Sequence, residues 1–123
     1  MDSILLVDDD RAAHFALGEL LGDLGAKLVH VESGEDALRH VLKQPFAAIL
    51  LDVRLPGMDG YEVAAAIRSL ERTRRTPIIF MSAEEDRRNA VRDGSAEMFL
   101  RKPLEPDVLV PQVVRCLSTS ATQ

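Results

Sequence analysis

Residues 47–60 read AAILLDVRLPGMDG, an apolar run that stops at Asp52 and gives way to a turn. A short, wholly apolar run of this kind is typical of a strand that helices cover on both faces. Pro56-Gly57 marks the turn that follows, before the next helical segment begins. We therefore expect the Asp52 carboxylate to lie at the carboxyl end of a buried strand.

Other apolar runs end in polar groups in the same way. Residues 4–7 end in Asp8-Asp9-Asp10, residues 77–81 are followed by Ser82, and the run that contains Leu100 ends in Arg101-Lys102-Pro103. If these strands are parallel neighbours, their polar groups meet at one edge of the sheet, where ligands bind in open α/β folds. Carboxylates packed that closely repel one another and are stable only with a cation among them.

Short apolar runs alternate with segments of helical period along the chain, which indicates βαβ units and a parallel sheet. Leu17, Leu20, Leu21 and Leu24 follow the spacing of a core-facing helix that Gly25 closes, while Pro111 predicts a late start or a kink in the last helix. The expected strands are residues 3–7, 27–31, 47–51, 77–81 and 97–100, and the other expected helices are residues 33–43, 60–71, 84–93 and 106–117.

Size and composition favour one domain over residues 1–123, with a polar, frayed tail at residues 118–123. The longest apolar stretch is far shorter than the roughly 20 residues of a membrane span, and no signal peptide is visible, so we expect a cytoplasmic protein. A net charge of −5 argues against direct binding to nucleic acid. Cys116 is alone and forms no intramolecular disulfide.

Oxygen ligands at the predicted edge favour Mg²⁺, which binds through one or two carboxylates and bridges substrate phosphate. Asp9 and Asp52 are the expected direct ligands, Asp8 acts through a water molecule, and the backbone carbonyl of Arg54 fills another position. Once the charge is offset, the Asp52 carboxylate can attack an electrophilic phosphorus. In-line phosphoryl transfer then needs mainly positioning and charge neutralisation.

Two further groups complete this predicted chemistry. The ammonium group of Lys102 supplies positive charge to the phosphoryl oxygens, and the hydroxyl group of Ser82 supplies a hydrogen bond.

At this point the chain resembles the receiver domains of two-component response regulators over nearly its whole length. The segments that carry the resemblance are Leu6-Val7-Asp8-Asp9-Asp10, residues 51–60, Met81-Ser82-Ala83 and Leu100-Arg101-Lys102-Pro103. Each segment alone is modest evidence, whereas all four in this order are strong. The resemblance implies a doubly wound, five-stranded parallel sheet of flavodoxin-like order 2-1-3-4-5 with five helices.

It also implies a function. Asp52 would take a phosphoryl group from a histidine kinase or a histidine phosphotransfer protein, with Mg²⁺, and the domain would catalyse only its own phosphorylation and dephosphorylation. Ser82 would move toward the phosphate and Phe99 would turn inward behind it, and the Lys102-Pro103 bond would be cis. No output domain is visible in the sequence, so we expect the signal to leave by contact with a downstream protein or by onward phosphotransfer.

Three other residues have roles proposed from their position. Phe15 lies nearly opposite the leucine stripe of the first helix, so it should face solvent, where it could dock the phosphodonor. Arg54 and Glu84 follow Asp52 and Ser82 by two residues, positions that in this family overhang the phosphate, and their opposite charges would lengthen its lifetime. His14, with no metal-spaced companion, is expected to be a solvated surface residue.

Three alternatives stay open at this point. A haloacid-dehalogenase-type phosphatase would need a second acid at the position of Arg54, and a flavodoxin-like flavin carrier would need a Ser/Thr/Gly loop where Asp8-Asp9-Asp10 stands. A pseudo-receiver, which keeps the fold as an interaction module without phosphorylation, is the nearest rival. Intact Asp8, Asp9, Asp52, Ser82 and Lys102 argue against it.

Overall fold

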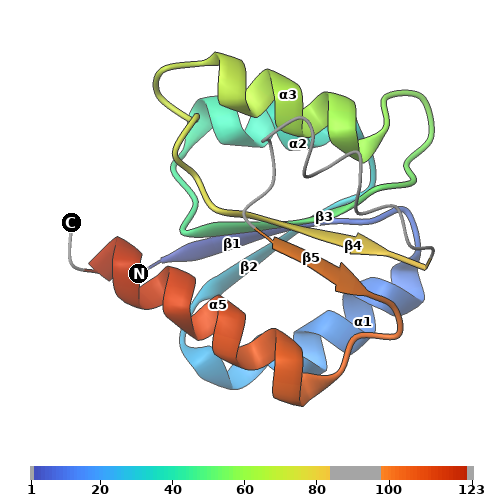
Figure 1. Cartoon of the computed structure of the whole chain (residues 1–123), viewed down its shortest axis with the longest axis vertical. Coiled ribbons are helices and arrows are strands. Elements are labelled where there is room, and N and C mark those ends of the chain that lie inside the picture. The colour runs from blue at the N-terminus through green and yellow to red at the C-terminus, as the bar shows by residue number, and fades with distance from the viewer. Residues whose placement is uncertain (1, 84–97, 122–123) are drawn as a thin grey trace.

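The computed structural model describes residues 2–83 and 98–121, and Figure 1 shows the whole chain. A five-stranded sheet runs through the centre in the order β2-β1-β3-β4-β5. Every neighbouring pair of strands is parallel. The predicted α/β class and strand order are therefore confirmed, and the order reverses between β1 and β3, where ligands bind in such sheets.

The strands lie close to their expected positions. Strands three, four and five end one residue later than predicted, because backbone pairing continues through Asp52, Ser82 and Arg101 after the apolar run has stopped. These polar residues are thus the last residues of their strands. The bounds are β1 Ser3–Val7, β2 Lys27–Val31, β3 Ala48–Asp52, β4 Ile78–Ser82 and β5 Met98–Arg101.

Four of the five expected α-helices fall within the described residues, together with a short 3-10 helix. The expected helix at residues 84–93, with Glu84, lies outside the described part of the chain. The final helix begins where predicted, so Pro111 does not delay its start, and it takes in residues 118–121, which we had assigned to the tail. The bounds are α1 Arg11–Leu21, η1 Gly22–Leu24, α2 Gly34–Lys43, α3 Gly60–Ser69 and α5 Pro106–Ala121.

Side-chain caps start the helices that flank the site. Oδ1 of Asp10 accepts a hydrogen bond from the backbone of Ala12 at 2.9 Å, which caps α1. Asp59 and Glu62 form a reciprocal capping box at the start of α3. Gly25, with a φ of 78°, ends the α1–η1 segment in the left-handed conformation that glycine adopts most easily.

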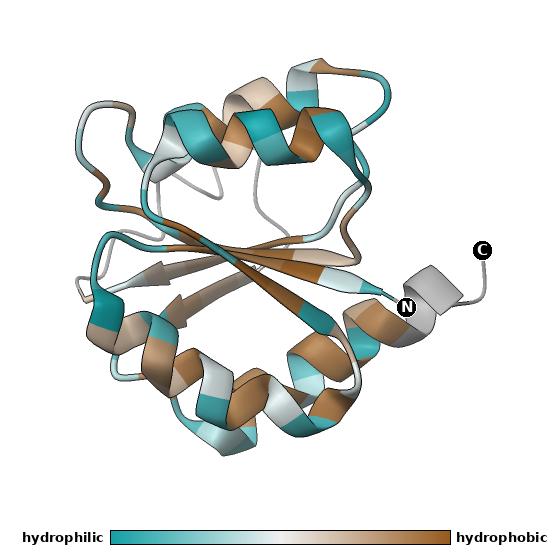
Figure 2. Ribbon diagram, turned by 180° about the vertical axis from the view of Figure 1, so that it is seen from behind, coloured by the Kyte–Doolittle hydropathy of each residue, from teal (hydrophilic) through white to brown (hydrophobic). Residues whose placement is uncertain are grey.

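Helices cover both faces of the sheet, α2 and α3 on one and α1 and α5 on the other (Figure 1). Alternate residues of β1 serve the two layers: Leu5 and Val7 pack on the α2–α3 side, and Ile4 and Leu6 on the α1–α5 side. The strands appear hydrophobic along most of their length in Figure 2. No helix in residues 2–83 and 98–121 has the length and apolar character that crossing a bilayer requires.

Candidate functional site

Three carboxylates meet at the carboxyl edge of the sheet, the edge to which the arrowheads in Figure 1 point. Val7 and Leu51 are register partners, so Asp8 and Asp52, one residue further on, lie side by side. Oxygen atoms of Asp8, Asp9 and Asp52 lie within 4.8 Å of one another. Asp8 is fully buried and Asp52 nearly so, whereas Asp9 is exposed. The predicted convergence of acids is therefore present in the structure.

Lys102 joins the two buried carboxylates. Its Nζ atom lies 2.7 Å from Oδ2 of Asp8 and 3.3 Å from Oδ2 of Asp52. The backbone N–H of Lys102 donates to the carbonyl of Ser82 at 2.7 Å, which holds the start of the β5–α5 loop against the end of β4. The Lys102-Pro103 peptide bond is cis, as the family resemblance implied.

Burial and the neighbouring charges shift the pKa values of two groups at the site. Burial, and less strongly the neighbouring charge of Asp8, raises the pKa of Asp52, although the N–H of Arg54 and the ammonium group of Lys102 oppose the rise. Burial alone would lower the pKa of Lys102, but its hydrogen bond to Asp8 and the charge of Asp52 raise it above the usual value. The pKa of Asp52 thus stays raised in spite of the contact with Lys102.

The turn after β3 is built closely around Asp52. The backbone N–H of Arg54 donates to Oδ1 of Asp52 at 3.1 Å, so the chain folds back over this carboxylate. The backbone N–H of Gly60 donates to the carbonyl of Val53 at 2.8 Å. A Cβ atom at Gly60 would collide with the Asp52 carbonyl oxygen and lie 2.8 Å from Cα of Val53, so only glycine fits there.

His14 is not the solvated residue that we expected. Its side chain is buried, and Nε2 donates to the main-chain carbonyl of Asp8 at 2.6 Å. Its Nδ1 lies 2.8 Å from Nδ1 of His30 on β2. The spacing of His14 to Leu17 and Leu21, i+3 and i+7, could have placed it on the buried face of α1. The contact with His30 has no such signal in the sequence.

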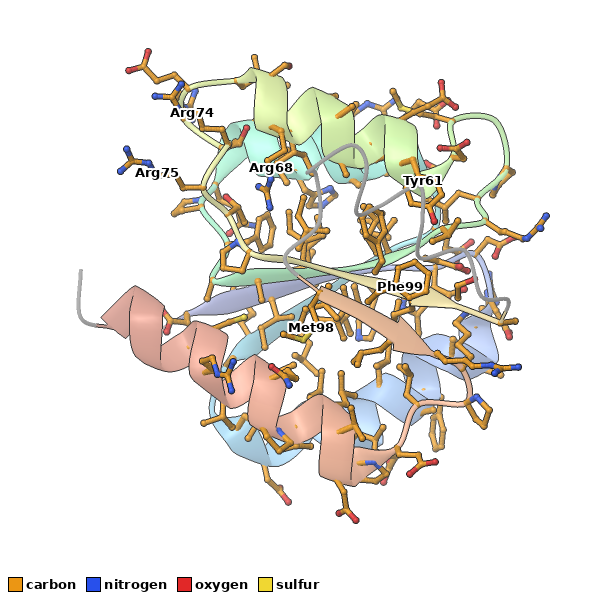
Figure 3. The ribbon with its side chains drawn as sticks, viewed as in Figure 1. Tyr61, Arg68, Arg74, Arg75, Met98 and Phe99 are labelled. Carbon is orange, nitrogen blue, oxygen red and sulfur yellow. The ribbon has the colours of Figure 1, made fainter. Side chains whose placement is uncertain are left out.

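The remaining candidate residues lie around this centre. Ser82 is buried at the end of β4, and Phe15 is 73% exposed on α1, as expected. Phe99 is half-buried against the α2–α3 layer, with its ring centroid 6.2 Å from that of Phe80. Tyr61 of α3 lies on the same side of the sheet (Figure 3), with its ring 5.0 Å from Phe80. Phe99 thus borders a packed aromatic group.

The donor set fits a hard divalent cation. All three clustered side chains offer carboxylate oxygens, and a site with one exposed acid leaves room for the waters that Mg²⁺ retains. Three carboxylates face the single ammonium group of Lys102 here, and burial keeps the pKa of Asp52 raised in spite of that contact. A bound Mg²⁺ ion would supply the missing positive charge.

Comparison with known proteins agrees with this arrangement. The family model of the response regulator receiver domain matches residues 4–114. The chain belongs to the response regulator receiver family. Receiver domains are parts of two-component signalling systems and act as phosphoacceptor switches rather than as enzymes with separate substrates.

Receiver relatives occur within both regulators and kinases. The chain is 39% identical to the transcriptional regulatory protein AfsQ1 of Streptomyces coelicolor over 89% of its own length and 48% of that protein. It is 32% identical to the sensor histidine kinase GacS of Pseudomonas protegens over 91% of its own length, but spans 13% of that protein. The chain thus spans less than half of the length of these curated relatives.

One solved receiver structure bears directly on the metal. The receiver domain of the sensor histidine kinase PA1611 from Pseudomonas aeruginosa, with a magnesium ion coordinated in its active site cleft, is 32% identical with a TM-score of 0.85. The comparison covers 95% of this chain and 98% of that one. A putative response regulator from Chloroflexus aurantiacus, also 32% identical, has a TM-score of 0.87 over 95% of this chain and 98% of that one.

Proposed function

We propose that this receiver domain is a phosphorylation-dependent switch in which Asp52, with Mg²⁺, accepts a phosphoryl group from a histidine kinase or a histidine phosphotransfer protein. One observation carries the proposal: Nζ of Lys102 lies 2.7 Å from Asp8 and 3.3 Å from Asp52, in a cluster with the Asp9 carboxylate. Such a gathering of charge costs folding stability, since desolvated acids repel one another. We infer that the cluster is kept because it serves a function.

The chemical step follows from the position of these groups. An Asp52 carboxylate oxygen attacks the phosphorus and forms an acyl phosphate, while the P–N bond to the donor imidazole breaks and its electron pair stays on nitrogen. Lys102 lies where its ammonium group can follow the phosphoryl oxygens as charge builds on them. Bound Mg²⁺ would neutralise charge on the acids and on the phosphoryl oxygens.

The metal would be held by Asp9 and Asp52 directly and by Asp8 through a water molecule. The backbone carbonyl of Arg54 is the further ligand that we propose, because this residue already folds back over the Asp52 carboxylate through its N–H group. The buried Asp8, which is anchored on Lys102, is better suited to an indirect role than the exposed Asp9.

The output of the switch depends on contacts made only in the phosphorylated state. A phosphoryl group adds about −1.5 to −2 charges and strong acceptor oxygens beside the Ser82 hydroxyl group. Ser82 then moves toward the phosphate, and Phe99, half-buried beside Phe80, turns further inward. Such state-specific contacts shift a two-state equilibrium by their differential free energy.

We propose that the switch works in the cytoplasm, as the sequence predicts, and passes its signal to a protein target or onward to another histidine, without binding DNA itself. Phe15 would form part of the surface that the phosphodonor contacts, because its ring is exposed on α1, the helix that follows Asp8-Asp9-Asp10.

The stability of the covalent label tests this function. After incubation with a phosphodonor and Mg²⁺, wild-type protein should carry a label that acid and base both remove, as expected for an acyl phosphate. Phe99 and Ser82 resonances should shift in the same sample. A protein that keeps its fold, binds Mg²⁺ and gains no label would instead be a pseudo-receiver.

A further inference from the structure

A chain of hydrogen bonds links the edge strand of the sheet to the acidic cluster. His30 lies on β2, the strand furthest from β5, and its Nδ1 atom is 2.8 Å from Nδ1 of His14 on α1. Nε2 of His14 is in turn 2.6 Å from the carbonyl oxygen of Asp8. The two rings meet edge to face, with centroids 4.7 Å apart.

The direction of these bonds follows from the acceptor at the end of the chain. A carbonyl oxygen can only accept, so Nε2 of His14 carries a proton and donates it to Asp8. In neutral His14 the Nδ1 atom is then an acceptor, and Nδ1 of His30 is the donor. Partial burial on the His14 side of the ring, followed by the neighbouring His14 itself, lowers the pKa of His30, which agrees with a neutral ring at this position.

The carbonyl that accepts from His14 belongs to the peptide plane between Asp8 and Asp9. The other polar groups of Asp8 are also held: its N–H donates to Val31, Oδ1 accepts from the backbone of Asp10, and Oδ2 contacts Lys102. Asp9 by contrast is exposed. The peptide plane that His14 holds also contains the backbone N–H of Asp9, so this plane helps to set the direction in which the Asp9 side chain points.

We propose that His14, supported by His30, is a positioning residue that sets the Mg²⁺ affinity of the site by orienting the Asp8–Asp9 peptide. This inference rests on the proposed function for its purpose, but Mg²⁺ affinity alone tests it. Groups one layer away from metal ligands typically change metal affinity 10- to 100-fold when they are removed.

The experiment compares matched variants by calorimetric titration with Mg²⁺ and by thermal unfolding without it. His14→Leu removes the donor, and we expect Mg²⁺ to bind about tenfold more weakly. His14→Gln keeps a side-chain N–H and should bind Mg²⁺ closer to wild type than to His14→Leu. His40→Leu is the control, because His40 bonds to Asp36 within α2, away from the acids, and should bind as wild type does.

His30→Leu covers the case in which His14→Leu does not fold, since His30 is exposed. We expect a weakening of about fivefold, the factor that corresponds to one typical net hydrogen bond. Unchanged Mg²⁺ affinity in folded His14→Leu, or in His30→Leu, would overturn the proposal. So would an equal loss in His14→Leu and His14→Gln, which would indicate packing alone, or a wild type that does not bind Mg²⁺. A wild type that binds Mg²⁺ but takes no phosphoryl group contradicts only the proposed function.

Discussion

The Nζ atom of Lys102 lies 3.3 Å from Oδ2 of Asp52, a longer contact than the 2.7 Å that joins the same atom to Asp8. The lysine is thus anchored on Asp8 and reaches toward Asp52 without fully neutralising it. Burial keeps the pKa of Asp52 raised in spite of this contact. The carboxylate that is proposed to attack phosphorus is therefore the less compensated of the two.

Loss of the Asp52 charge should stabilise the protein when Mg²⁺ is absent. Folding raises the pKa of Asp52 above its usual 3.8. The stability that this residue contributes is therefore fully present below pH 3.8, where the carboxyl is protonated, and is lost as the pH rises through the folded-state pKa. We expect Asp52→Asn to raise the free energy of unfolding at neutral pH by on the order of 1 kcal/mol. The gain should shrink near pH 4.

Urea unfolding in chelator across this pH range measures the difference. Saturating Mg²⁺ should reverse the order of the two proteins, because only wild type keeps the full ligand set. An Asp52→Asn protein that is less stable than wild type at neutral pH without Mg²⁺ would show that the charge of Asp52 does not destabilise the folded protein.

Gly60 should tolerate no side chain. In Gly60→Ala the added methyl group meets the Asp52 carbonyl oxygen and the Val53 backbone, and we expect a cost of about 2 kcal/mol and slower labelling of Asp52. Gly18→Ala is the matched control, because a methyl group there meets no atom within 4 Å in the middle of α1. It should raise stability by about 0.5 to 1 kcal/mol. Equal thermal stability of the two variants would contradict the packing described around Asp52.

Phe15 should matter for a protein donor but not for a small one. Phe15→Ala is expected to slow transfer from a phosphorylated histidine phosphotransfer protein at least about fivefold, as loss of a significant interface contact does. Labelling by acetyl phosphate should be unchanged. Leu42→Ala changes another exposed apolar residue, on α2, and serves as the control that should leave both rates unchanged. Slowing of both reactions by Phe15→Ala would remove its assignment to docking.

Arg54 and Glu84 are proposed to prolong the life of the phosphate by obstructing the attacking water. The Arg54→Ala, Glu84→Ala double variant should lose its label several times faster than wild type, since both obstructing charges are gone. Arg54→Lys with Glu84→Asp keeps the charges and should decay more slowly than the alanine pair. Decay measured by intact mass after removal of the donor decides the matter, and equal lifetimes in all three proteins would refute the idea.

The sequence was enough to predict the sheet because its strands are nearly continuous apolar runs. The same signal placed three strand ends one residue too early, since Asp52, Ser82 and Arg101 end the apolar pattern but not the backbone pairing. That pairing goes on past Asp52 to the bond from Val53 N–H to the Met81 carbonyl at 3.0 Å. Side-chain hydropathy indicates which residues are buried, whereas a strand ends where its backbone hydrogen bonds to the neighbouring strand stop.

The acidic cluster and Lys102 were predictable because parallel strands bring their carboxyl ends to one edge. The pair formed by His14 and His30 was not, because their contact depends on how α1 is seated against β2. The end of α5 was missed for a related reason: a polar composition in residues 118–121 predicts a tail, whereas the backbone continues the helix.

The central claim is that Asp8, Asp9 and Asp52 hold Mg²⁺ and make Asp52 a phosphoryl acceptor. Intact mass measurement after incubation with acetyl phosphate tests it most directly, with Mg²⁺ or with chelator, for wild type and Asp52→Asn. We predict that wild type gains the mass of one phosphoryl group only with Mg²⁺ and that Asp52→Asn gains none. Wild-type protein that stays unmodified with donor and metal in excess, or an Asp52→Asn variant that is labelled equally well, would contradict the account.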